Sequence, residues 1–171
     1  MGIRKILSTE VEADKDPNIQ KIIDINIVQK LIQFLSVDDR PDLQFEAAWS
    51  LTNMASGKHE HAQSISEKGA IPLFARLLYS PHPQIQEQAL WALGNFAGDS
   101  VDNRKLVINT GAIKTMSNLL LKSIENKHFQ LIKNGSWALS NIIRGKPTPP
   151  FPKLKPAVPA ICQTIIHNDD P

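Results

Sequence analysis

The chain has little cysteine and no long hydrophobic run. Its 171 residues include one cysteine, Cys162, so no disulfide can form within it, and a lone thiol fits a reducing compartment. No apolar stretch approaches the roughly 20 residues of a membrane-spanning helix. The first residues, MGIRKILST, contain no apolar core of signal-peptide length and, with Ile6 in place of Ser or Thr, no myristoylation pattern. We therefore expect a soluble intracellular protein that makes no contact with membranes.

Charge of one sign and catalytic motifs are scarce as well. Lysine and arginine total 19 against 17 aspartate and glutamate residues, so the formal net charge is +2, and the basic residues form no run. This balance gives no reason to expect binding to nucleic acid. No Ser/His/Asp set, glycine-rich phosphate loop or pair of catalytic carboxylates can be assembled. The prediction is a protein without enzymatic activity, catalytic residues or cofactors.

What the chain does contain is an internal repeat. GAIPLFARLL begins at Gly69 and GAIKTMSNLL at Gly111, a period of 42 residues, and looser copies begin at Asn26 and Ala157. The three tryptophans follow the same period, with intervals of 42 and 46 residues between WSLTN, WALGN and WALSN. The four additional residues of the last interval must lie after Gly111, and we expect the polar run SIENKHF to hold them.

Each unit is predicted to be helical. Segments 43–57 and 83–99 carry apolar residues at helical spacing, and we expect these helices to end at Gly57 and Gly98. A short amphipathic segment and another with one apolar face follow each of them, and no segment alternates like a strand. Three helices in about 42 residues are typical of armadillo or HEAT solenoids.

The tryptophan pattern indicates a binding surface. Residues four apart lie on one face of a helix, so each tryptophan is paired with an asparagine. We expect stacked repeats to set these pairs in a row on the concave face of the solenoid. Three asparagines on a core face would each need hydrogen-bond partners, which favours the surface over the core. The pairs are Trp49 with Asn53, Trp91 with Asn95, and Trp137 with Asn141.

Such a row suits a basic, extended peptide. Slots between indoles fit the apolar stem and cationic head of lysine or arginine, at about 0.5–2 kcal/mol per contact. A carboxamide both donates and accepts, so it can hold a peptide main chain without reading its sequence. Glu87 lies one turn before Trp91, and Asp99 lies beyond Asn95, so both acids would attract the cationic heads.

The repeats resemble one family, the importin-α nuclear-import adaptors. The resemblance rests on LQFEAAWSLTN, QEQALWALGNFAGDS and WALSN followed by Arg-Gly-Lys, and it extends from about Gly2 to Pro171. It implies an all-α, right-handed armadillo superhelix that holds the second to fourth repeats of the family and parts of the first and fifth. The expected units are 1–22 (the end of a preceding repeat), 23–57 (with a short or merged first helix), 58–99, 100–146 and a partial repeat at 147–171.

The resemblance also implies a function. In that family the tryptophan–asparagine array is the major binding site for nuclear localisation signals, so the chain would be a nuclear-import adaptor or a fragment of one, present in cytoplasm and nucleus. Asp99 matches the carboxylate that receives the key lysine, and Gly57 matches the glycine whose backbone helps to hold it. The full set of predicted peptide-binding residues is Trp49, Asn53, Gly57, Glu87, Trp91, Asn95, Asp99, Asn134, Trp137 and Asn141.

The sequence departs from the family beside Asp99. A threonine is usual five residues after the glycine, and here the position is Ala62, so a hydroxyl ligand for the lysine is missing. Lys58 and His59 replace small polar residues and would add repulsion near the site. No basic arm precedes Gly2, so we expect no direct recruitment of importin-β.

Plainer interpretations compete at three places. Asp99 and Ser100 stand at a helix start, so Asp99 is also a candidate N-cap. His59 and His61 point apart on a short helix with no third ligand at a zinc spacing, so we predict a surface segment without metal. Cys162 is predicted to be inert core.

Two other functions are compatible with the pattern. One is an armadillo scaffold whose groove takes another partner or an internal segment, and a remote one is a hydrolase that uses the His59–His61 region. The C-terminal helix around Ile161, Ile165 and Ile166 has no following repeat to cover it, so we also expect self-association or a frayed last repeat.

Overall fold

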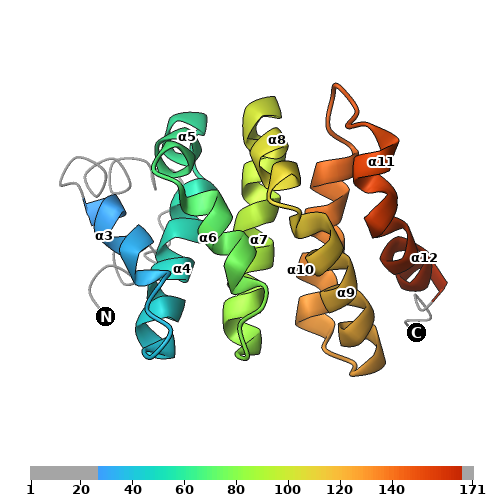
Figure 1. Cartoon of the computed structure of the whole chain (residues 1–171), viewed down its shortest axis with the longest axis horizontal. Helices are drawn as coiled ribbons and strands as arrows, with labels where there is room; N and C mark the ends of the chain where they lie inside the picture. Colours follow the sequence, from blue (N-terminus) through green and yellow to red (C-terminus); the bar gives the residue numbers. More distant parts are fainter. Residues whose placement is uncertain (1–26, 167–171) are drawn as a thin grey trace.

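A computed structural model describes residues 27–166, and every regular element in that range is a helix (Figure 1). The all-α prediction is confirmed there, whereas the predicted unit 1–22 lies outside the described residues. None of these helices is both long enough and apolar enough to cross a bilayer. The elements are α3 (Ile27–Phe34), α4 (Pro41–Ala55), α5 (His59–Glu67), α6 (Ala70–Leu77), α7 (Pro83–Asp99), α8 (Val101–Asn109), α9 (Ala112–Glu125), α10 (Phe129–Ile143), α11 (Phe151–Leu154), the 3-10 helix η1 (Lys155–Ala157) and α12 (Val158–Ile166).

The helices repeat as a triplet. A short first helix, a second helix and a long third helix follow one another in α5–α6–α7 and again in α8–α9–α10, and α3 and α4 take the second and third places of the unit before them. The third helices α4, α7 and α10 form one row, in which α7 packs against both of the others (Figure 1). Within the described range, the last unit consists of α11, η1 and α12.

Proline and glycine set the boundaries of the triplets. Pro41 and Pro83 stand in the first turn of α4 and α7, where the ring fixes φ near its helical value and no N–H group is needed. Gly69 and Gly111 have φ of 82° and 76° just before α6 and α9, a conformation that glycine adopts at little cost. The glycine that begins each repeated motif is therefore the turn between the first and second helices.

The predicted end of a third helix at Gly98 is wrong, because α7 continues through Gly98 to Asp99. Gly98 serves a different purpose. A β-carbon at this position would stand 3.1 Å from Nδ2 of Asn141 on α10. The glycine therefore marks a close approach of two helices, whereas α4 does end near the predicted place, at Ala55.

The additional residues of the longer repeat lengthen a helix. α9 has 14 residues where α6 has 8, and the SIE of the predicted host segment forms its last turn. The hydroxyl of Ser123 in that turn donates to the Leu119 carbonyl oxygen at 2.7 Å. The chain then turns at Lys127, whose φ is 57°, before α10 begins. The insertion is thus accommodated in the second helix and the turn after it.

The hydrophobic core runs through the whole stack. Its fully buried side chains include Leu51 and Met54 on α4 and Leu93 on α7. The rings of Phe74 on α6 and Phe96 on α7 meet with centroids 6.1 Å apart. Burial of apolar surface stabilises by about 25 cal/mol per Å², so this continuous core holds each third helix against its neighbours in the row.

Candidate functional site

Trp91 and Trp137 lie outside the core. They stand on α7 and α10 and expose 36% and 40% of their surface, whereas Trp49 on α4 is partly buried against the core. Large aromatic residues at helical spacing are usually buried well beyond this. The exposure agrees with the predicted binding face at two of the three positions, and at the third most of the side chain is used for packing.

A glycine of one repeat makes room for the tryptophan of the next. A β-carbon built on Gly94 of α7 would overlap the six-membered ring of Trp137 on α10, so the indole lies directly against the α7 backbone. The junction between α4 and α7 differs at the equivalent place. There the residue three after Trp49 is Thr52, which is fully buried.

The asparagine side chains connect neighbouring third helices. Nδ2 of Asn95 donates to the Thr52 carbonyl oxygen at 3.3 Å, and Nδ2 of Asn141 donates to the Gly94 carbonyl oxygen at 3.0 Å. Both bonds run from one repeat back to the previous one. Nδ2 of Asn53 instead donates within α4, to the carbonyl oxygen four residues earlier, at 2.9 Å.

These bonds weaken the sequence argument for the asparagines. That argument rested on the partners that three buried carboxamides would need, and the structure supplies one partner to each. Asn141 is 4% exposed and belongs to the α7–α10 junction. Asn53 and Asn95 are only partly buried, and these bonds use one of the two N–H groups that each carboxamide has.

Asp99 is held by two neighbours. Nδ1 of His59 lies 3.0 Å from both carboxylate oxygens, and Nδ2 of Asn103 donates to Oδ2 at 2.9 Å. The alternative prediction of Asp99 as an N-cap is wrong, because it is the last residue of α7 and Ser100 caps α8 by accepting from the Asn103 N–H group at 3.2 Å. The Asp99 side chain is 12% exposed and that of His59 53%.

The two histidines of α5 have opposite surroundings. The hydrogen bond to Asp99, together with the attraction of its charge, raises the pKa of His59. His61 is 2% exposed, and burial lowers its pKa, so the prediction of a surface segment is wrong for this residue. Residues 27–166 contain no group of three or more His, Cys, Asp or Glu side chains that could hold a metal ion.

The remaining predicted contacts of the lysine pocket lie beside α5. Gly57 is exposed in the turn after α4, and its N–H group donates to the Met54 carbonyl oxygen at 3.1 Å. A ligand would therefore meet its carbonyl oxygen. Ala62, the position without the usual hydroxyl, is fully buried and presents no surface to a ligand.

Glu87 and Asn134 lie in the N-terminal halves of α7 and α10. Glu87 is partly buried, and burial raises its pKa against the attraction of His128, which lowers it. Oδ1 of the partly buried Asn134 accepts from Nε2 of Gln130 at 3.5 Å. Both remain predictions as ligand contacts.

Two residues of α8 that the sequence reasoning missed support the site. Asn103 holds the Asp99 carboxylate, as described above. Arg104 is 6% exposed, and its Nη2 atom donates to the Lys146 carbonyl oxygen at 2.9 Å, beyond the end of α10. Asn103 and Arg104 stand one period after His61 and Ala62. A position-by-position comparison of the first helices would have found them, because Ala62 had already been singled out beside the predicted site.

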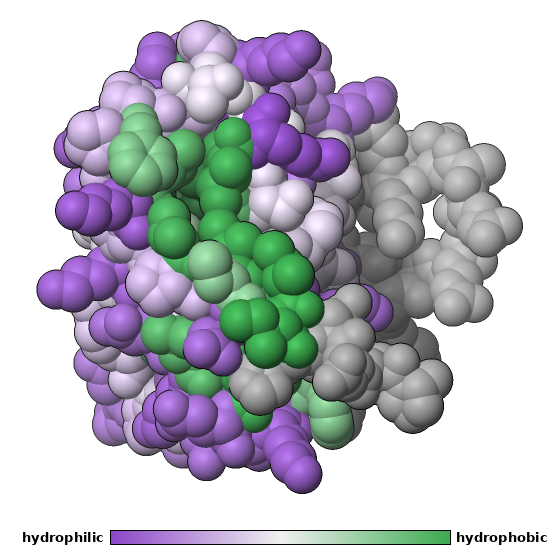
Figure 2. Space-filling view, turned by 90° about the vertical axis from the view of Figure 1, so that its right-hand side faces the viewer, coloured by the Kyte–Doolittle hydropathy of each residue, from purple (hydrophilic) through white to green (hydrophobic). Residues whose placement is uncertain are grey.

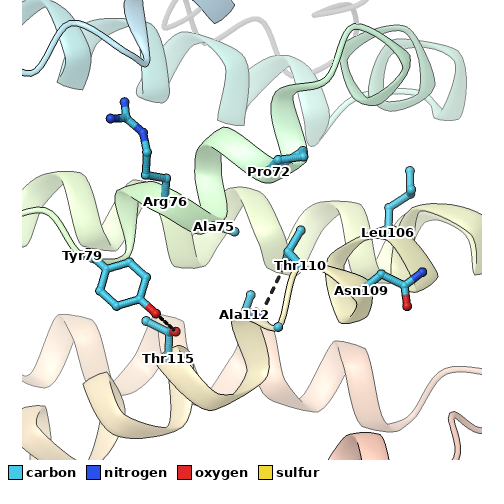
Figure 3. A pocket seen from close by; sticks show the side chains of 10 residues that line it. Pro72, Ala75, Arg76, Tyr79, Leu106, Asn109, Thr110, Ala112 and Thr115 are labelled. Atoms are coloured by element: carbon cyan, nitrogen blue, oxygen red, sulfur yellow. Dashed lines mark hydrogen bonds between the residues drawn. The ribbon is translucent and has the colours of Figure 1, made fainter.

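A hollow of about 560 Å³ lies elsewhere, between α6, α8 and α9 (Figure 3). Oη of Tyr79 and Oγ1 of Thr115 are 2.7 Å apart at its rim, and Oγ1 of Thr110 accepts from the Ala112 N–H group at 3.2 Å. None of the predicted peptide-binding residues lines it. Its rim is satisfied by contacts within the protein, and we assign it no ligand.

The C-terminal end of the stack carries an apolar band (Figure 2). Val158, Ile165 and Ile166 of α12 are 41%, 71% and 66% exposed, and a hollow of about 330 Å³ beside them is lined in part by Ile161. Cys162 is exposed too, so its prediction as core is wrong. The physical reason is that a third helix covers α6 and α9, whereas no third helix of its own unit covers α12 within the described residues.

Comparison with known proteins agrees with these features. A family model for the Armadillo/beta-catenin-like repeat matches residues 15–56 and 58–98. The chain is 50% identical over 169 residues to Importin subunit alpha-B of Dictyostelium discoideum, across 99% of the chain and 32% of that protein. It is 45% identical over 167 residues to Importin subunit alpha-2 of Arabidopsis thaliana, across 98% of the chain and 30% of that protein. It therefore spans about a third of the length of these curated relatives.

Solved armadillo structures share the fold. A designed armadillo repeat protein in complex with the peptide (KR)4 matches with a TM-score of 0.75 and 26% identity, over 92% of this chain and 60% of that one. An engineered protein matches with a TM-score of 0.77 and 26% identity, over 98% and 73%. The predictions of an armadillo solenoid, of similarity to importin-α and of a non-enzymatic protein are confirmed by these relatives.

Proposed function

We propose, from the premise that this chain is an armadillo-repeat relative of the importin-α subunits, that it binds extended basic peptides of the nuclear-localisation-signal class along the face formed by α4, α7 and α10. In this role it is a nuclear-import adaptor or a part of one, and it moves between cytoplasm and nucleus with its cargo.

The observation that carries the proposal is the exposure of two indoles one repeat apart. Trp91 and Trp137 stand on helices that pack side by side, and each exposes more than a third of its surface. A slot between such rings accepts the stem of a lysine or arginine, and the cationic head meets the negative face of the ring. A designed protein with the same fold has been solved with a peptide of alternating lysine and arginine, which supports this class of ligand.

The polar residues of the face suit the rest of such a peptide. Asn53 and Asn95 are partly buried and have donor and acceptor groups for an extended main chain. Asp99 would receive one lysine head, with the carbonyl oxygen of Gly57 as a second contact. Glu87 adds negative charge one turn before Trp91. Charge-assisted hydrogen bonds are stronger than neutral ones, so the Asp99 contact would contribute most to the selection of lysine.

The alternative is an armadillo scaffold whose face takes another partner or an internal segment. The burial of Asn141 favours it, because a main chain that uses this carboxamide would have to displace the bond to Gly94. The two functions differ in the ligand that they require, and only the first depends on a lysine in the peptide.

Titration of the chain with a lysine-rich signal peptide distinguishes them. Binding should change the fluorescence of Trp91 and Trp137, and replacement of the central lysine of the peptide by alanine should abolish the change. The double variant Trp91→Ala/Trp137→Ala should lose most of the affinity by calorimetry, while Tyr79→Ala, at the rim of the separate hollow, should bind as the wild type does. No response at saturating peptide would favour the scaffold.

The apolar band on α12 supports a second proposal, which is that the isolated chain associates with a second copy through this end. Ala70 and Leu77 of α6 are 0% and 3% exposed, whereas Val158 and Ile165, at the equivalent positions of the looser copy that begins at Ala157, are 41% and 71% exposed. Repeat arrays need a polar cap at such ends. Light scattering should show a dimer that Ile165→Glu dissociates, and a monomer at high concentration would refute it.

A further inference from the structure

The pair formed by His59 and Asp99 occupies the group on which the proposed function depends. The ring belongs to the first residue of α5, and the carboxylate belongs to the last residue of α7, 40 positions later. Nδ1 lies 3.0 Å from Oδ1 and 3.0 Å from Oδ2, so the ring faces both oxygens of the carboxylate. The histidine thus stands where the cationic head of a ligand would bind.

The carboxylate has little room for a second cation while this pair is formed. Oδ2 also accepts from Nδ2 of Asn103 at 2.9 Å, and the Asp99 side chain is 12% exposed. The His59 side chain, in contrast, is 53% exposed. A ligand can therefore gain access to Asp99 by displacing the ring, at the cost of this one contact.

The charges around the ring all act in the same direction. α4, α6 and α7 pack against α5, and among their charged groups Asp99 on α7 is the one that acts on His59 in the described residues. Glu60 on α5 itself also attracts the imidazolium, whereas the partial burial of the ring acts in the opposite sense. The protonated form of the ring is consequently the form that competes for the carboxylate.

We propose that His59 is an internal competitor for the lysine of the bound peptide at Asp99, and that it makes peptide affinity depend on pH. The proposal rests on the proposed function. The ring holds the carboxylate when it is protonated and yields it more readily when it is neutral, so binding releases a proton and is tighter at higher pH. His59 is then an affinity-setting residue that neither the missing hydroxyl at Ala62 nor the tryptophan array would reveal.

The test is a peptide titration at about pH 6 and about pH 8, on either side of the range in which histidine changes charge. The peptide is lysine-rich and lacks histidine. His59→Ser should bind about twofold to fivefold more tightly than the wild type at the lower pH, as expected for one exposed ion pair, with a smaller difference at the higher pH. His82→Ser removes another exposed histidine, at the N-terminus of α7, and should behave as the wild type does.

Equal affinities of wild type and His59→Ser at both pH values would overturn the competitor role while leaving the proposed function intact. Absence of binding by every variant at both pH values would sink the proposed function and this inference with it. A second readout is the pKa of His59 by NMR. It should fall when peptide saturates the site, because Asp99 is then shared with the ligand, and an unchanged pKa in the saturated complex would contradict displacement.

Discussion

In the triplets α5–α6–α7 and α8–α9–α10, a basic side chain of the first helix reaches the end of the third helix of the same triplet. In the first triplet His59 of α5 meets the Asp99 carboxylate at the end of α7. In the second, Arg104 of α8 donates to the Lys146 carbonyl oxygen beyond α10 at 2.9 Å, and also to the Ala97 carbonyl oxygen at 3.4 Å. Gly145 takes the place of the acid there, and a β-carbon on it would overlap the guanidinium group.

The two triplets differ in that the first has an exchangeable contact and the second a permanent one. Arg104 is 6% exposed, and its planar guanidinium group donates to two backbone carbonyl oxygens, so it links two backbone segments. Because Gly145 stands in place of the acid, this contact offers no carboxylate to a ligand. The His59 side chain is 53% exposed, and its charge changes near neutral pH. The first helix therefore serves stability in one triplet and offers a contact that is open to a ligand in the other, from different positions of the repeat. The difference follows from burial and from the residue that stands opposite.

Removal of the permanent contact should have the largest effect. Arg104→Ala leaves the Lys146 carbonyl without its charged donor and removes a buried side chain, so we expect the free energy of unfolding to fall by about 2–4 kcal/mol. Urea denaturation followed by circular dichroism measures it. Lys105→Ala, on the next residue with a 65% exposed side chain, is the matched control and should change stability by less than about 0.5 kcal/mol. Equal losses would show that Arg104 is not special.

The packing of α10 against α7 should be the next most sensitive. Gly94→Ala forces the Trp137 indole away from α7, which we expect to cost about 1–3 kcal/mol, as other overpacked sites do. Gly135→Ala is the control. A β-carbon there would meet Leu120 at 3.5 Å, an ordinary contact, so a helical glycine is replaced at no steric cost and stability should rise by about 0.5–1 kcal/mol. Thermal unfolding of both variants decides whether the close approach is specific to Gly94.

Changes at the exchangeable contact of His59 with Asp99 should alter peptide affinity more than the free energy of unfolding. Asp99→Asn removes the charge that a lysine head would meet, and we expect a loss of about tenfold in peptide affinity from one charge-assisted hydrogen bond. Glu87→Gln should reduce peptide affinity less, because in our proposal Glu87 adds negative charge but does not receive a lysine head directly. Calorimetric titration of both variants compares them, and a larger loss for Glu87→Gln would move the lysine pocket to the α7–α10 side.

The smallest effect should be the pH dependence of stability from His59. Its pKa is raised in the folded chain, so its stabilising contribution is complete below the pKa of the unfolded state and is lost as pH rises through the folded value. The stability of the wild type should therefore fall relative to His59→Ser between about pH 6 and about pH 8. His61, whose pKa is lowered by burial, acts in the opposite sense but is present in both proteins and cancels. A constant difference across this range would mean that the pair does not form.

Much of the fold was predictable from local patterns. The period of 42 residues and the start of α7 at Pro83 follow from spacing and turn chemistry that act over a few residues. The errors concern residues whose neighbour comes from another repeat. Gly98 looked like a helix end because its true partner, Asn141, is 43 positions away. Cys162 looked buried because its own segment does not show that no third helix covers α12 within residues 27–166.

The sequence by itself determined the helical repeat, the row of tryptophan–asparagine pairs and the resemblance to importin-α, because each is a matter of residue type at a fixed interval. Only the tertiary structure decided what those residues do at each junction. It gave every asparagine a backbone partner, placed the indole of Trp137 on Gly94 and set His59 against Asp99. Apart from the bond of Asn53 within α4, these contacts join positions about one repeat apart, and their geometry depends on how helices stack, which no local interval specifies.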